Sequence, residues 1–475
     1  MGEVGGGVEW SGELTVSVDA NRFDPLKACD VLVVGGGNAG LCAAIAARQA
    51  GASVLLVEQA SRDGRGGNSR HVRNLRIAHG VSNEFLFGVY GEDEYWADLV
   101  QVTGVHTDET LARLMIAESA GAVDWMAQCG GRFQKTSEGA VSPSRKTAFL
   151  LGGGKALLNA YDLTAERIGV DVLYDAEVLS LPVDGGLATI VVGGIAASVR
   201  AKAVVVASGS CQANIEWLRA GWGAAADGFV IRGSAYAKGR MLMNLLDQQV
   251  APIGDPVKCH MVAVDARAPK FDGGIVTRLD CVPFGIVVDR NGARFHDEGA
   301  DIGPRRYALW GRLVAQCPDQ IAYAIFDAKA EGLFRPSIYP PIQAQSIGGL
   351  GESLAIDPPS LAATVQAFNR AVRPGDGRTE GIMPPKTRGA VPIDTPPYGA
   401  YPLRPGITFS YLGVKIDENA RVLMANGRPS GNLFAAGSIM AGNVLGHGYL
   451  AGIGLTIGTV FGRIAGREAA RYAGH

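Results

Sequence analysis

The feature that most constrains this chain is a glycine-rich turn near its beginning. An apolar segment, Val31–Val34, runs directly into Gly35-Gly-Gly-Asn-Ala-Gly40, which has the spacing G-x-G-x-x-G. The pattern predicts a strand over 29–34, a helix of small residues over 38–50 and a second strand over 53–58. Because a strand–helix–strand unit of this kind builds a parallel sheet, we expect an α/β fold.

An acidic residue at the end of the second predicted strand completes a dinucleotide-binding pattern. Glu58 follows Gly37 by 21 positions, where a carboxylate can accept hydrogen bonds from ribose hydroxyls. The glycines allow the tight turn, the approach of backbone N–H groups to a pyrophosphate, and close helix packing, and the helix N-terminus favours negative charge. The predicted cofactor residues of this unit are Gly35, Gly37, Asn38, Ala39, Gly40, Glu58 and Gln59.

A second glycine-rich tract lies at the opposite end of the chain. The sequence Gly431-Asn-Leu-Phe-Ala-Ala-Gly437-Ser438 is followed by closely spaced glycines as far as Gly466. The tract indicates that the far end of the chain returns to the nucleotide site, as flavoproteins require and most NAD domains do not. We therefore predict an FAD-dependent oxidoreductase in which Gly437 and Ser438 contact the cofactor.

A polar loop after the second predicted strand offers further donors to the cofactor. We predict that Gly66, Gly67, Asn68 and Ser69 extend the anion site through backbone N–H groups and side chains. The arginines around this loop are interpreted mainly as a solvated basic face; they are Arg62, Arg65, Arg70, Arg73 and Arg76. His71 stays open as a point of covalent flavin attachment, because the spacing alone does not require it.

Charge and cysteine content exclude several classes of protein. The 475 residues carry 44 basic and 46 acidic side chains, for a net charge of −2, which argues against a nucleic-acid or anionic-membrane binder. The seven cysteines include no C-x-x-C pair, so zinc, iron–sulfur clusters and attached haem have no ligand pattern. Without a secretory signal or a long apolar run, the protein is expected to be cytoplasmic and to have no membrane span.

Composition along the chain predicts how the domains are arranged. Residues 1–28 are expected to be a flexible leader, and 29–254 the first part of the FAD-binding domain. Prolines are spread through 255–408 and long helical patterns are few there, so we predict an inserted second domain. Residues 409–475 return to strands and a final helix, and are expected to complete the FAD-binding domain.

With these motifs in place, the chain after residue 28 resembles the fumarate reductase/succinate dehydrogenase flavoprotein superfamily, and within it the tricarballylate dehydrogenase branch. The residues that carry the resemblance are Gly35–Gly40 with Glu58, Arg65–Arg76, Ala207–Gly209, His260–Asp280, Arg294–Glu298 and Gly437–Gly466. The resemblance implies a Rossmann-like FAD-binding domain of the GR2 type, interrupted by an α+β capping domain. It also implies that the substrate is held between the two domains.

The same resemblance implies further contacts and partners. Val178 is expected beside the adenine, and the final helix is expected to point its N-terminus at the flavin ring, where it would stabilise negative charge on the reduced ring. The additional cofactor residues are Val178, Ala207, Ser208, Gly209, Gly452, Gly454, Leu455 and Thr456. A membrane-bound iron–sulfur protein is the implied electron acceptor, with oxygen or a quinone as the alternative.

The predicted substrate chamber departs from that of fumarate reductases. Thr277-Arg278 stands where those enzymes have Thr-Glu, Thr408 or Phe409 where they have a substrate-binding histidine, and Ile302 where they have an arginine. Fumarate is therefore not the expected substrate. Forming a double bond in an acid requires cations for its carboxylates and a group that takes up a proton. The predicted catalytic residues are Arg278, Arg305, Arg306, Arg404, His260, Tyr307 and Tyr449, and which of them moves the proton is left open.

The leading functional hypothesis is an FAD-dependent dehydrogenase that forms a C=C bond in a small polycarboxylate, of the tricarballylate to cis-aconitate type. Hydride is expected to pass to flavin N5, and a proton to a base of the capping domain. A desaturase or reductase of an apolar carbonyl compound is a second hypothesis, because Gly446-His-Gly-Tyr449 is similar to a segment of 3-ketosteroid dehydrogenases. A fumarate reductase-like enzyme is a third, and a flavin-binding redox carrier without a substrate of its own is a fourth.

Overall fold

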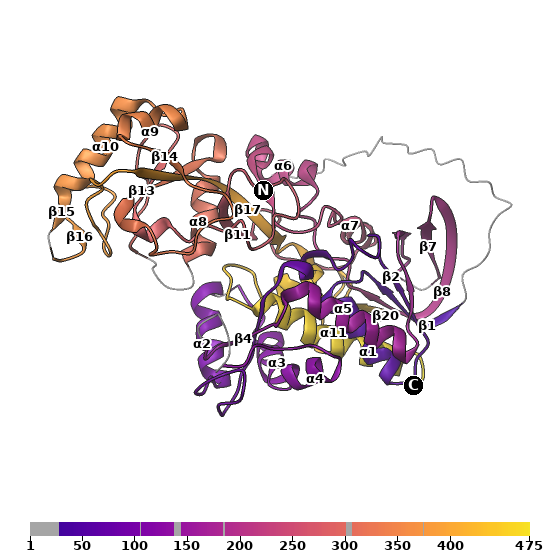
Figure 1. Ribbon diagram of the computed structural model, residues 1–475. Helices are drawn as coiled ribbons and strands as arrows, with labels where there is room; N and C mark the ends of the chain where they lie inside the picture. Colours follow the sequence, from indigo (N-terminus) through magenta and orange to yellow (C-terminus); the bar gives the residue numbers. More distant parts are fainter. Residues whose placement is uncertain (1–27, 105, 137–143, 184–185, 301–305, 374) are drawn as a thin grey trace.

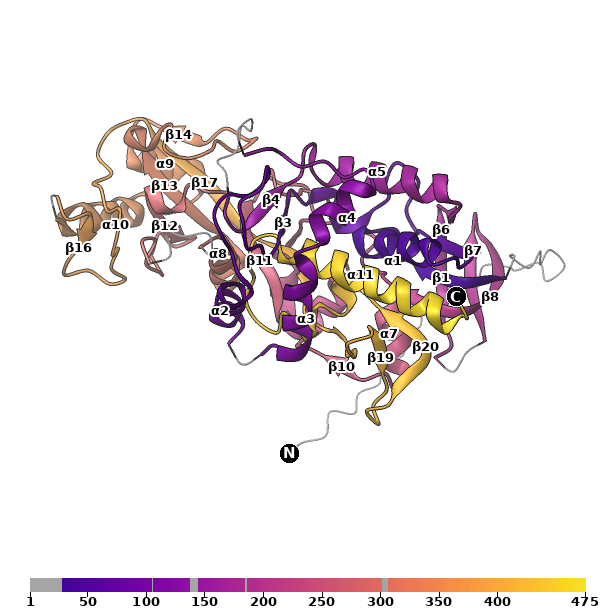
Figure 2. The same ribbon diagram turned by 90° about the horizontal axis from the view of Figure 1, so that it is seen from below.

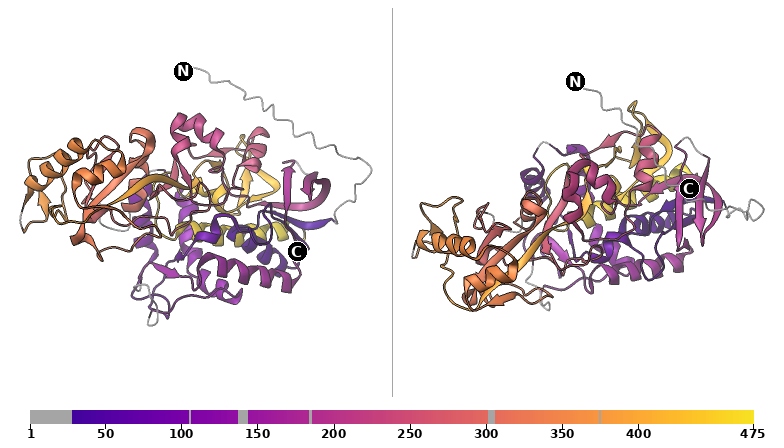
Figure 3. Two further views of the ribbon diagram at one scale, coloured as in Figure 1. Left: turned by 45° about the horizontal axis from the view of Figure 1, so that its top comes forward. Right: turned by 90° about the horizontal axis from the view of Figure 1, so that it is seen from above.

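The computed structural model describes residues 28–475 except for 105, 137–143, 184–185, 301–305 and 374 (Figure 1). The predicted leader, 1–28, lies outside the described residues apart from its last position. Two lobes are visible, and the views in Figure 3 place α9 and α10 at the end of the molecule farthest from the C-terminus. Each lobe is built on its own β-sheet.

The first lobe contains an eight-stranded sheet with β1 near its centre. β1 runs parallel to β2 on one side and to β8 on the other, and β20 continues the sheet in parallel beyond β8. The strands are β1 (Cys29–Val34), β2 (Val54–Val57), β5 (Asp171–Leu173), β6 (Ala176–Ser180), β7 (Leu187–Val192), β8 (Ile195–Val206), β19 (Arg421–Leu423) and β20 (Pro429–Ala435). Because helices cover this sheet, β2 is buried along its whole length and apolar at every position.

Two helices from opposite ends of the chain pack against each other beneath this sheet. α1 (Asn38–Gln49) lies along α11 (Ile453–Tyr472), as Figure 2 shows. Glycines allow this close approach: a Cβ on Gly462 would lie 2.5 Å from the Ala39 carbonyl oxygen, and one on Gly466 would lie 2.1 Å from that of Ala43. The C-terminal tract therefore returns to the N-terminal turn, as the sequence predicts.

The remaining elements of the first lobe surround this helix pair and the two cavities described below. The helices are α2 (Glu92–Thr103), α3 (Glu109–Ser119), α4 (Ala122–Gln128), α5 (Gly153–Ile168) and α7 (Arg240–Asp247). A further helix, α6 (Ile215–Trp222), packs through Leu218 against residues of the second sheet. β3 (Asn74–Arg76) and β4 (Thr147–Phe149) form a short antiparallel pair, and β10 (Pro252–Ile253) pairs with β18 (Gly413–Val414).

The second lobe contains a six-stranded sheet in which the long strand β17 is the organising element. β11, β13 and β14 pair with it antiparallel, β9 pairs with it in parallel, and β12 pairs with β13. The strands are β9 (Val230–Ile231), β11 (Cys259–Asp265), β12 (Ile286–Asp289), β13 (Ala322–Asp327), β14 (Ile342–Ala344) and β17 (Tyr398–Ser410). The helices are α8 (Arg306–Ala315), α9 (Ile347–Leu354) and α10 (Pro358–Ala371), and β15 (Val372–Arg373) pairs with β16 (Arg378–Thr379).

The predicted α/β class, a dinucleotide-binding sheet with a second mixed sheet inserted, is confirmed. The strands show how the two lobes are joined. The chain enters the second sheet with β9, near residue 230, and leaves it at the end of β17, at Ser410. The domain limits predicted at 254 and 408 stay a prediction. The strand β17 connects the inserted lobe directly to the C-terminal part of the first lobe.

Candidate cofactor and substrate site

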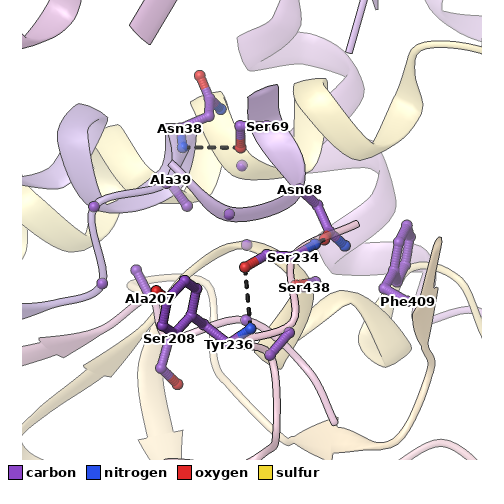
Figure 4. Close-up of a pocket in the computed structure, with 18 of the residues that line it drawn as sticks. Asn38, Ala39, Asn68, Ser69, Ala207, Ser208, Ser234, Tyr236, Phe409 and Ser438 are labelled. Atoms are coloured by element: carbon purple, nitrogen blue, oxygen red, sulfur yellow. Dashed lines mark hydrogen bonds between the residues drawn. The ribbon is translucent and has the colours of Figure 1, made fainter. Parts of the chain in front are cut away.

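A long cavity follows the two glycine-rich turns of the first lobe (Figure 4). In Figure 4, Asn38 and Ser69 lie on one side of it, and Ala207, Ser208 and Tyr236 on the other. Most of the predicted cofactor residues line this cavity, which we call the cofactor cavity. They are Gly35, Gly37, Asn38, Ala39, Glu58, Gln59, Gly66, Gly67, Asn68, Ser69, Val178, Ala207, Ser208, Gly209, Gly437, Ser438, Gly454 and Leu455.

The N-terminus of α1 opens onto the cofactor cavity with its backbone donors fixed in place. Gly37 precedes the helix in an extended conformation and provides no side-chain cap. The Asn38 backbone N–H donates to the Ser69 hydroxyl over 3.0 Å, which holds the 66–69 loop against the turn. This arrangement concentrates positive helix-end charge where a pyrophosphate would lie.

The carboxylate of Glu58 sits at the end of β2, as the motif predicts. It accepts hydrogen bonds from the backbone N–H groups of Gly36 at 2.7 Å and Ala60 at 2.8 Å. The side chain is buried, and this burial raises the pKa of the carboxyl group above its ordinary value, although the backbone N–H groups act in the opposite direction. The acceptor is therefore held rigidly at the wall where a ribose would bind.

Three predicted cofactor residues, Gly40, Gly452 and Thr456, do not line the cofactor cavity, and Gly452 lines the cavity next to it. A Cβ on Gly40 would lie 1.8 Å from the Gly35 carbonyl oxygen, so this glycine allows the turn to pack. Gly452 precedes α11 in the left-handed region at φ +85°, and the Thr456 hydroxyl donates to the carbonyl oxygens of Arg76 and Gly452. Direct contact of these three residues with the cofactor stays a prediction.

The side chain of Asn38 also serves the scaffold. Its Nδ2 donates to the Thr459 hydroxyl at 3.1 Å and to the Leu455 carbonyl oxygen at 3.4 Å. These bonds tie the first turn of α1 to α11, so that the two ends of the chain form one wall. The N-terminus of α11 begins at Gly452 without a side-chain cap, and Gly454 and Leu455 line the cofactor cavity there.

These features fit FAD on structural grounds. One cavity is lined by glycine-rich backbone, by the N-termini of α1 and α11, and by the buried carboxylate of Glu58. At Gly437 a Cβ would lie 2.8 Å from that of Ala39, and its φ of +81° favours glycine, so the backbone there is shaped for close approach. When bound, FAD would supply the two-electron redox chemistry that side chains lack.

A second cavity adjoins the first, and both lobes line it; we call it the substrate cavity. The two cavities share Asn68, Val72, Thr408, Tyr449 and Leu455. Three predicted catalytic residues meet here: Arg278, His260 and Tyr449. Asn68 joins the lobes at this boundary, because its Nδ2 donates to the Thr408 carbonyl oxygen and its Oδ1 accepts from the Ser234 backbone N–H at 3.1 Å.

The substrate cavity is strongly basic. Among the described residues, five arginine or lysine side chains line it, against one carboxylate, Asp280; they are Arg73, Arg76, Lys146, Arg232 and Arg278. Arg278 lies 2.7 Å from Asp280, and the buried Arg232 donates to the Thr408 hydroxyl at 2.7 Å and to the Gly274 carbonyl oxygen at 3.2 Å. A chamber lined by more cations than carboxylates favours anionic ligands.

The structure corrects the interpretation of two loop arginines and adds two residues that the sequence missed. Arg73 and Arg76 line the substrate cavity and do not belong to a solvated face. Arg232 and Lys146 stand in no motif, so only their position after folding reveals them. Arg62, Arg65 and Arg70 instead pair locally with Glu166, Asp162 and the Gly64 carbonyl oxygen, respectively.

His260 and Tyr449 form a stacked pair at the boundary of the two cavities. Their ring centroids are 3.6 Å apart and the planes differ by 10°. Burial lowers the pKa of His260 well below its ordinary value, and the nearby positive charges of Arg232 and Arg278 act in the same direction, so the imidazole is neutral at neutral pH. A Cβ on Gly454 would lie 3.2 Å from the Tyr449 hydroxyl, which places that hydroxyl beside the first turn of α11.

The remaining predicted catalytic residues are not brought to this site in the part of the chain that the structure describes. Arg404 donates to the carbonyl oxygens of Asp319 and Gln320 in the second lobe and lines neither cavity, and its catalytic role stays a prediction. Arg305 lies outside the described residues, as do the side chains of Arg306 and Tyr307 at the start of α8.

His71, the open candidate for flavin attachment, has a different neighbour in the structure. Its Nε2 lies 2.9 Å from an Asp272 oxygen, and the ring lines the substrate cavity, not the cofactor cavity. Burial lowers the pKa of the imidazole, whereas Asp272 acts to raise it. Covalent attachment stays a prediction.

The fold and the two adjoining cavities define a nucleotide-dependent oxidoreductase. Comparison with known families makes this specific: residues 30–455 match the model of the FAD binding domain family, and the chain belongs to that family. FAD is its cofactor, and the protein is an oxidoreductase of the type that acts on CH–CH groups. Its predicted membership of the wider fumarate reductase/succinate dehydrogenase flavoprotein superfamily is confirmed, whereas the tricarballylate branch stays a hypothesis.

The similar proteins include reductases with different substrates. A probable fumarate reductase, Ifc3, of Shewanella frigidimarina is 27% identical over 470 residues, which is 94% of this chain and 76% of that protein. Digoxin reductase of Eggerthella lenta is 25% identical over 522 residues, covering 96% of this chain and 89% of that protein. The open conformation of a flavocytochrome c3 fumarate reductase superposes with a TM-score of 0.76 at 23% identity, covering 95% of this chain and 80% of that one.

Two structural features bear on partners and metals. In the part of the chain that the structure describes, no helix is both long and apolar enough to cross a bilayer. The same residues contain no cluster of three or more His, Cys, Asp or Glu side chains suited to a metal ion.

Proposed function

We propose that this protein is an FAD-dependent dehydrogenase that forms a C=C bond in a small polycarboxylate, with tricarballylate to cis-aconitate as the type reaction. The observation that carries the proposal is the charge of the substrate cavity. Among the described residues, five basic side chains and one carboxylate line it, and the cavity lies beside the N-terminus of α11. Several fixed cations in a partly desolvated chamber match a substrate with several carboxylates.

The arginines of the second lobe have the clearest role in binding. Arg232 and Arg278 line the substrate cavity close enough to His260 to oppose its protonation. We assign them to the carboxylates on either side of the reacting carbon–carbon bond. Bound in this way, the carboxylates also make the neighbouring C–H more acidic, because the cations stabilise the negative charge that develops when the proton leaves.

The proton acceptor that the geometry favours is Tyr449. Its ring lines both cavities, and its hydroxyl lies beside the N-terminus of α11, where negative charge is stabilised. In the proposed reaction, one carbon of the CH–CH unit loses a proton to the Tyr449 phenolate as the double bond forms, and bound FAD would supply the two-electron acceptor for the hydride of the neighbouring carbon. This places the base on the C-terminal segment and not on the capping domain, where the sequence led us to expect it.

His260 is the positioning residue of this pair. A neutral imidazole stacked at 3.6 Å holds the Tyr449 ring in place, and the neighbouring cations make His260 itself a poor proton acceptor. The helix N-terminus at Gly454 and Leu455 lines the cofactor cavity, and its donors would stabilise negative charge on a reduced flavin bound there.

A second candidate is a desaturase or reductase of an apolar carbonyl compound, similar to 3-ketosteroid dehydrogenases. It is favoured by Tyr449 at the cavity boundary and by the similarity to digoxin reductase. The basic lining of the substrate cavity argues against it. A fumarate reductase-like activity is the third, favoured by the similarity to the Shewanella protein. For reoxidation of the flavin we propose a separate membrane-bound iron–sulfur protein, a partner implied by the family resemblance alone.

The test is anaerobic mixing of the purified holoenzyme with tricarballylate, succinate or a 3-ketosteroid. We expect tricarballylate to bleach the flavin absorbance and to yield cis-aconitate, which chromatography identifies. Bleaching by the ketosteroid alone would establish the second candidate. Absence of bleaching with every carboxylate would refute the proposed function. Reoxidation of a dye-reduced enzyme by fumarate would favour the third.

A further inference from the structure

We propose that His447 is a positioning residue for Tyr449, because it connects the loop that carries Tyr449 to Arg312 of the second lobe only while its imidazole is neutral. Protonation of His447 would break this contact between the lobes and make the substrate site sensitive to pH. The inference rests on the proposed function, in which Tyr449 takes up the proton, and deepens it.

The loop 446–449 contacts the second lobe through two of its side chains. The Tyr449 ring stacks on that of His260, a residue of β11, with the ring centroids 3.6 Å apart. Two positions earlier in the chain, the Nε2 atom of His447 lies 3.0 Å from a guanidinium nitrogen of Arg312, a residue of α8. Because α8 packs directly against β11, two adjoining elements of the second lobe contact this loop.

The backbone of the same loop is fixed to the first lobe. The Gly446 N–H donates to the His106 carbonyl oxygen at 2.9 Å, and a Cβ on Gly446 would lie 2.1 Å from that oxygen. A Cβ on Gly448 would lie 2.1 Å from the carbonyl oxygen of Val102 in α2. The two glycines therefore allow the loop to lie directly against the end of α2 and the residues after it. His447 stands between them, and its side chain reaches the second lobe.

The contact between His447 and Arg312 requires a neutral imidazole. A guanidinium donates hydrogen bonds and has no acceptor, so Nε2 must accept with its lone pair while the ring proton is on Nδ1. A protonated imidazole carries N–H donors on both nitrogens and a positive charge, so it would repel Arg312 instead of binding it. One proton therefore decides whether the contact exists.

The charged groups that act on His447 all oppose its protonation. Arg312 belongs to α8, Lys258 immediately precedes β11, and His106 lies between α2 and α3 with its ring centroid 6.4 Å from that of His447. Burial lowers the pKa of the His447 imidazole below its ordinary value, and these three groups act in the same direction. The contact is therefore intact at neutral pH and is lost at acid pH, as the pH falls through this lowered pKa.

Three variants separate this role from a purely structural one. Holoenzymes of wild type, His447→Gln, Arg312→Met and His106→Gln would be compared by amide hydrogen exchange between about pH 5 and about pH 8, where histidine changes its charge. The readout is the protection of the peptide that contains 446–449, corrected for the intrinsic pH dependence of exchange. The amide oxygen introduced by His447→Gln can accept from Arg312 and does not titrate. His106→Gln is the matched control, because the exposed His106 contacts the loop through its backbone carbonyl. The rate of flavin bleaching by tricarballylate is recorded on the same samples.

In wild type we expect the protection of this peptide to fall about 10- to 100-fold toward acid pH, the range for loss of a charge-assisted hydrogen bond. His106→Gln should respond in the same way, His447→Gln should stay protected, and Arg312→Met should show low protection at every pH. Bleaching should slow more steeply toward acid pH in wild type than in His447→Gln.

Equal loss of protection in wild type and His447→Gln, or a pH response that disappears in His106→Gln, would overturn the contact. Bleaching rates of wild type and His447→Gln that fall in parallel would overturn the positioning of Tyr449. If the exchange pattern is as expected and none of the enzymes bleaches with tricarballylate, the contact is supported and the proposed dehydrogenase reaction is refuted.

Discussion

Replacement of Tyr449 by phenylalanine tests the proposed chemistry most directly. The substitution removes only the hydroxyl, which lies beside the first turn of α11 at the boundary of the two cavities. The phenyl ring can keep its stacked contact with His260 at 3.6 Å. Packing and cofactor binding should therefore persist, while the group that takes up the proton is lost.

The expected size of the effect follows from the role assigned to the hydroxyl. A positioned general base contributes about 100- to 10,000-fold to the rate of a proton-coupled step, or about 3 to 5 kcal/mol of activation free energy. Aromatic stacking contributes about 0.5 to 1.5 kcal/mol and is retained in the variant. We therefore expect a large loss of reaction rate with little change in flavin content or thermal stability.

The assay is stopped-flow flavin bleaching under anaerobic conditions with saturating tricarballylate. The rate constant for bleaching isolates flavin reduction from the later reaction with an electron acceptor. In wild type, deuterium at the carbon that loses the proton should slow bleaching, because Tyr449 removes that proton in the same step or before it. In Tyr449→Phe the overall rate should fall by the factor given above.

Tyr411→Phe provides the matched control. The Tyr411 hydroxyl donates to the Gly448 carbonyl oxygen, next to Tyr449 in sequence, and the side chain lines neither cavity. This variant should bleach at a rate close to wild type even where its stability falls. A Tyr449→Phe enzyme that bleaches as fast as wild type would refute the assignment of the base, and an equal loss in both variants would assign the effect to the loop and not to proton transfer.

Two further predictions concern the cofactor and stability. Glu58→Gln replaces one carboxylate oxygen by an NH₂ group facing the backbone N–H of Gly36 or Ala60, which costs about 1 to 3 kcal/mol and should raise the FAD dissociation constant about 5- to 150-fold. A fluorescence titration that shows unchanged affinity would contradict this. For Lys386, burial lowers the pKa of the ammonium from 10.5 to about 8. Between these two pH values the lysine is therefore protonated in the unfolded chain and largely neutral in the folded protein. The destabilisation is complete below about pH 8 and is relieved as the pH rises to 10.5, so the unfolding free energy of wild type relative to Lys386→Met should increase over that range. If denaturant unfolding showed that the difference in unfolding free energy between the two proteins does not change with pH, the lowered pKa of Lys386 would be excluded.

Local motifs predicted the cofactor site well. The Gly35–Gly40 turn and Glu58 act through backbone geometry within one strand–helix–strand unit, so their spacing in the sequence fixes their spacing in space. The C-terminal glycine tract was also informative, because close helix packing leaves a periodic trace at Gly462 and Gly466. Gly40 and Thr456 show the limit of this reasoning, since a motif identifies its members but not which of them line the cavity.

The substrate cavity could not be derived in the same way. Arg232 and Arg404 are both isolated arginines near strands of the second sheet, yet one faces the cavity and the other binds the carbonyl oxygens of a turn. Arg73 and Lys146 are distant in sequence and line the same cavity only because β3 pairs with β4. No local sequence pattern indicates that these residues line one cavity.

The sequence by itself therefore determined the α/β class, the FAD site and the return of the chain end to that site, because short-range backbone geometry encodes all three. The tertiary structure decided which cations line the substrate cavity and which hydroxyl-bearing side chain, Tyr449, lies where the two cavities meet. Those properties depend on strand register and on how two lobes meet, and both are set by packing between segments hundreds of residues apart.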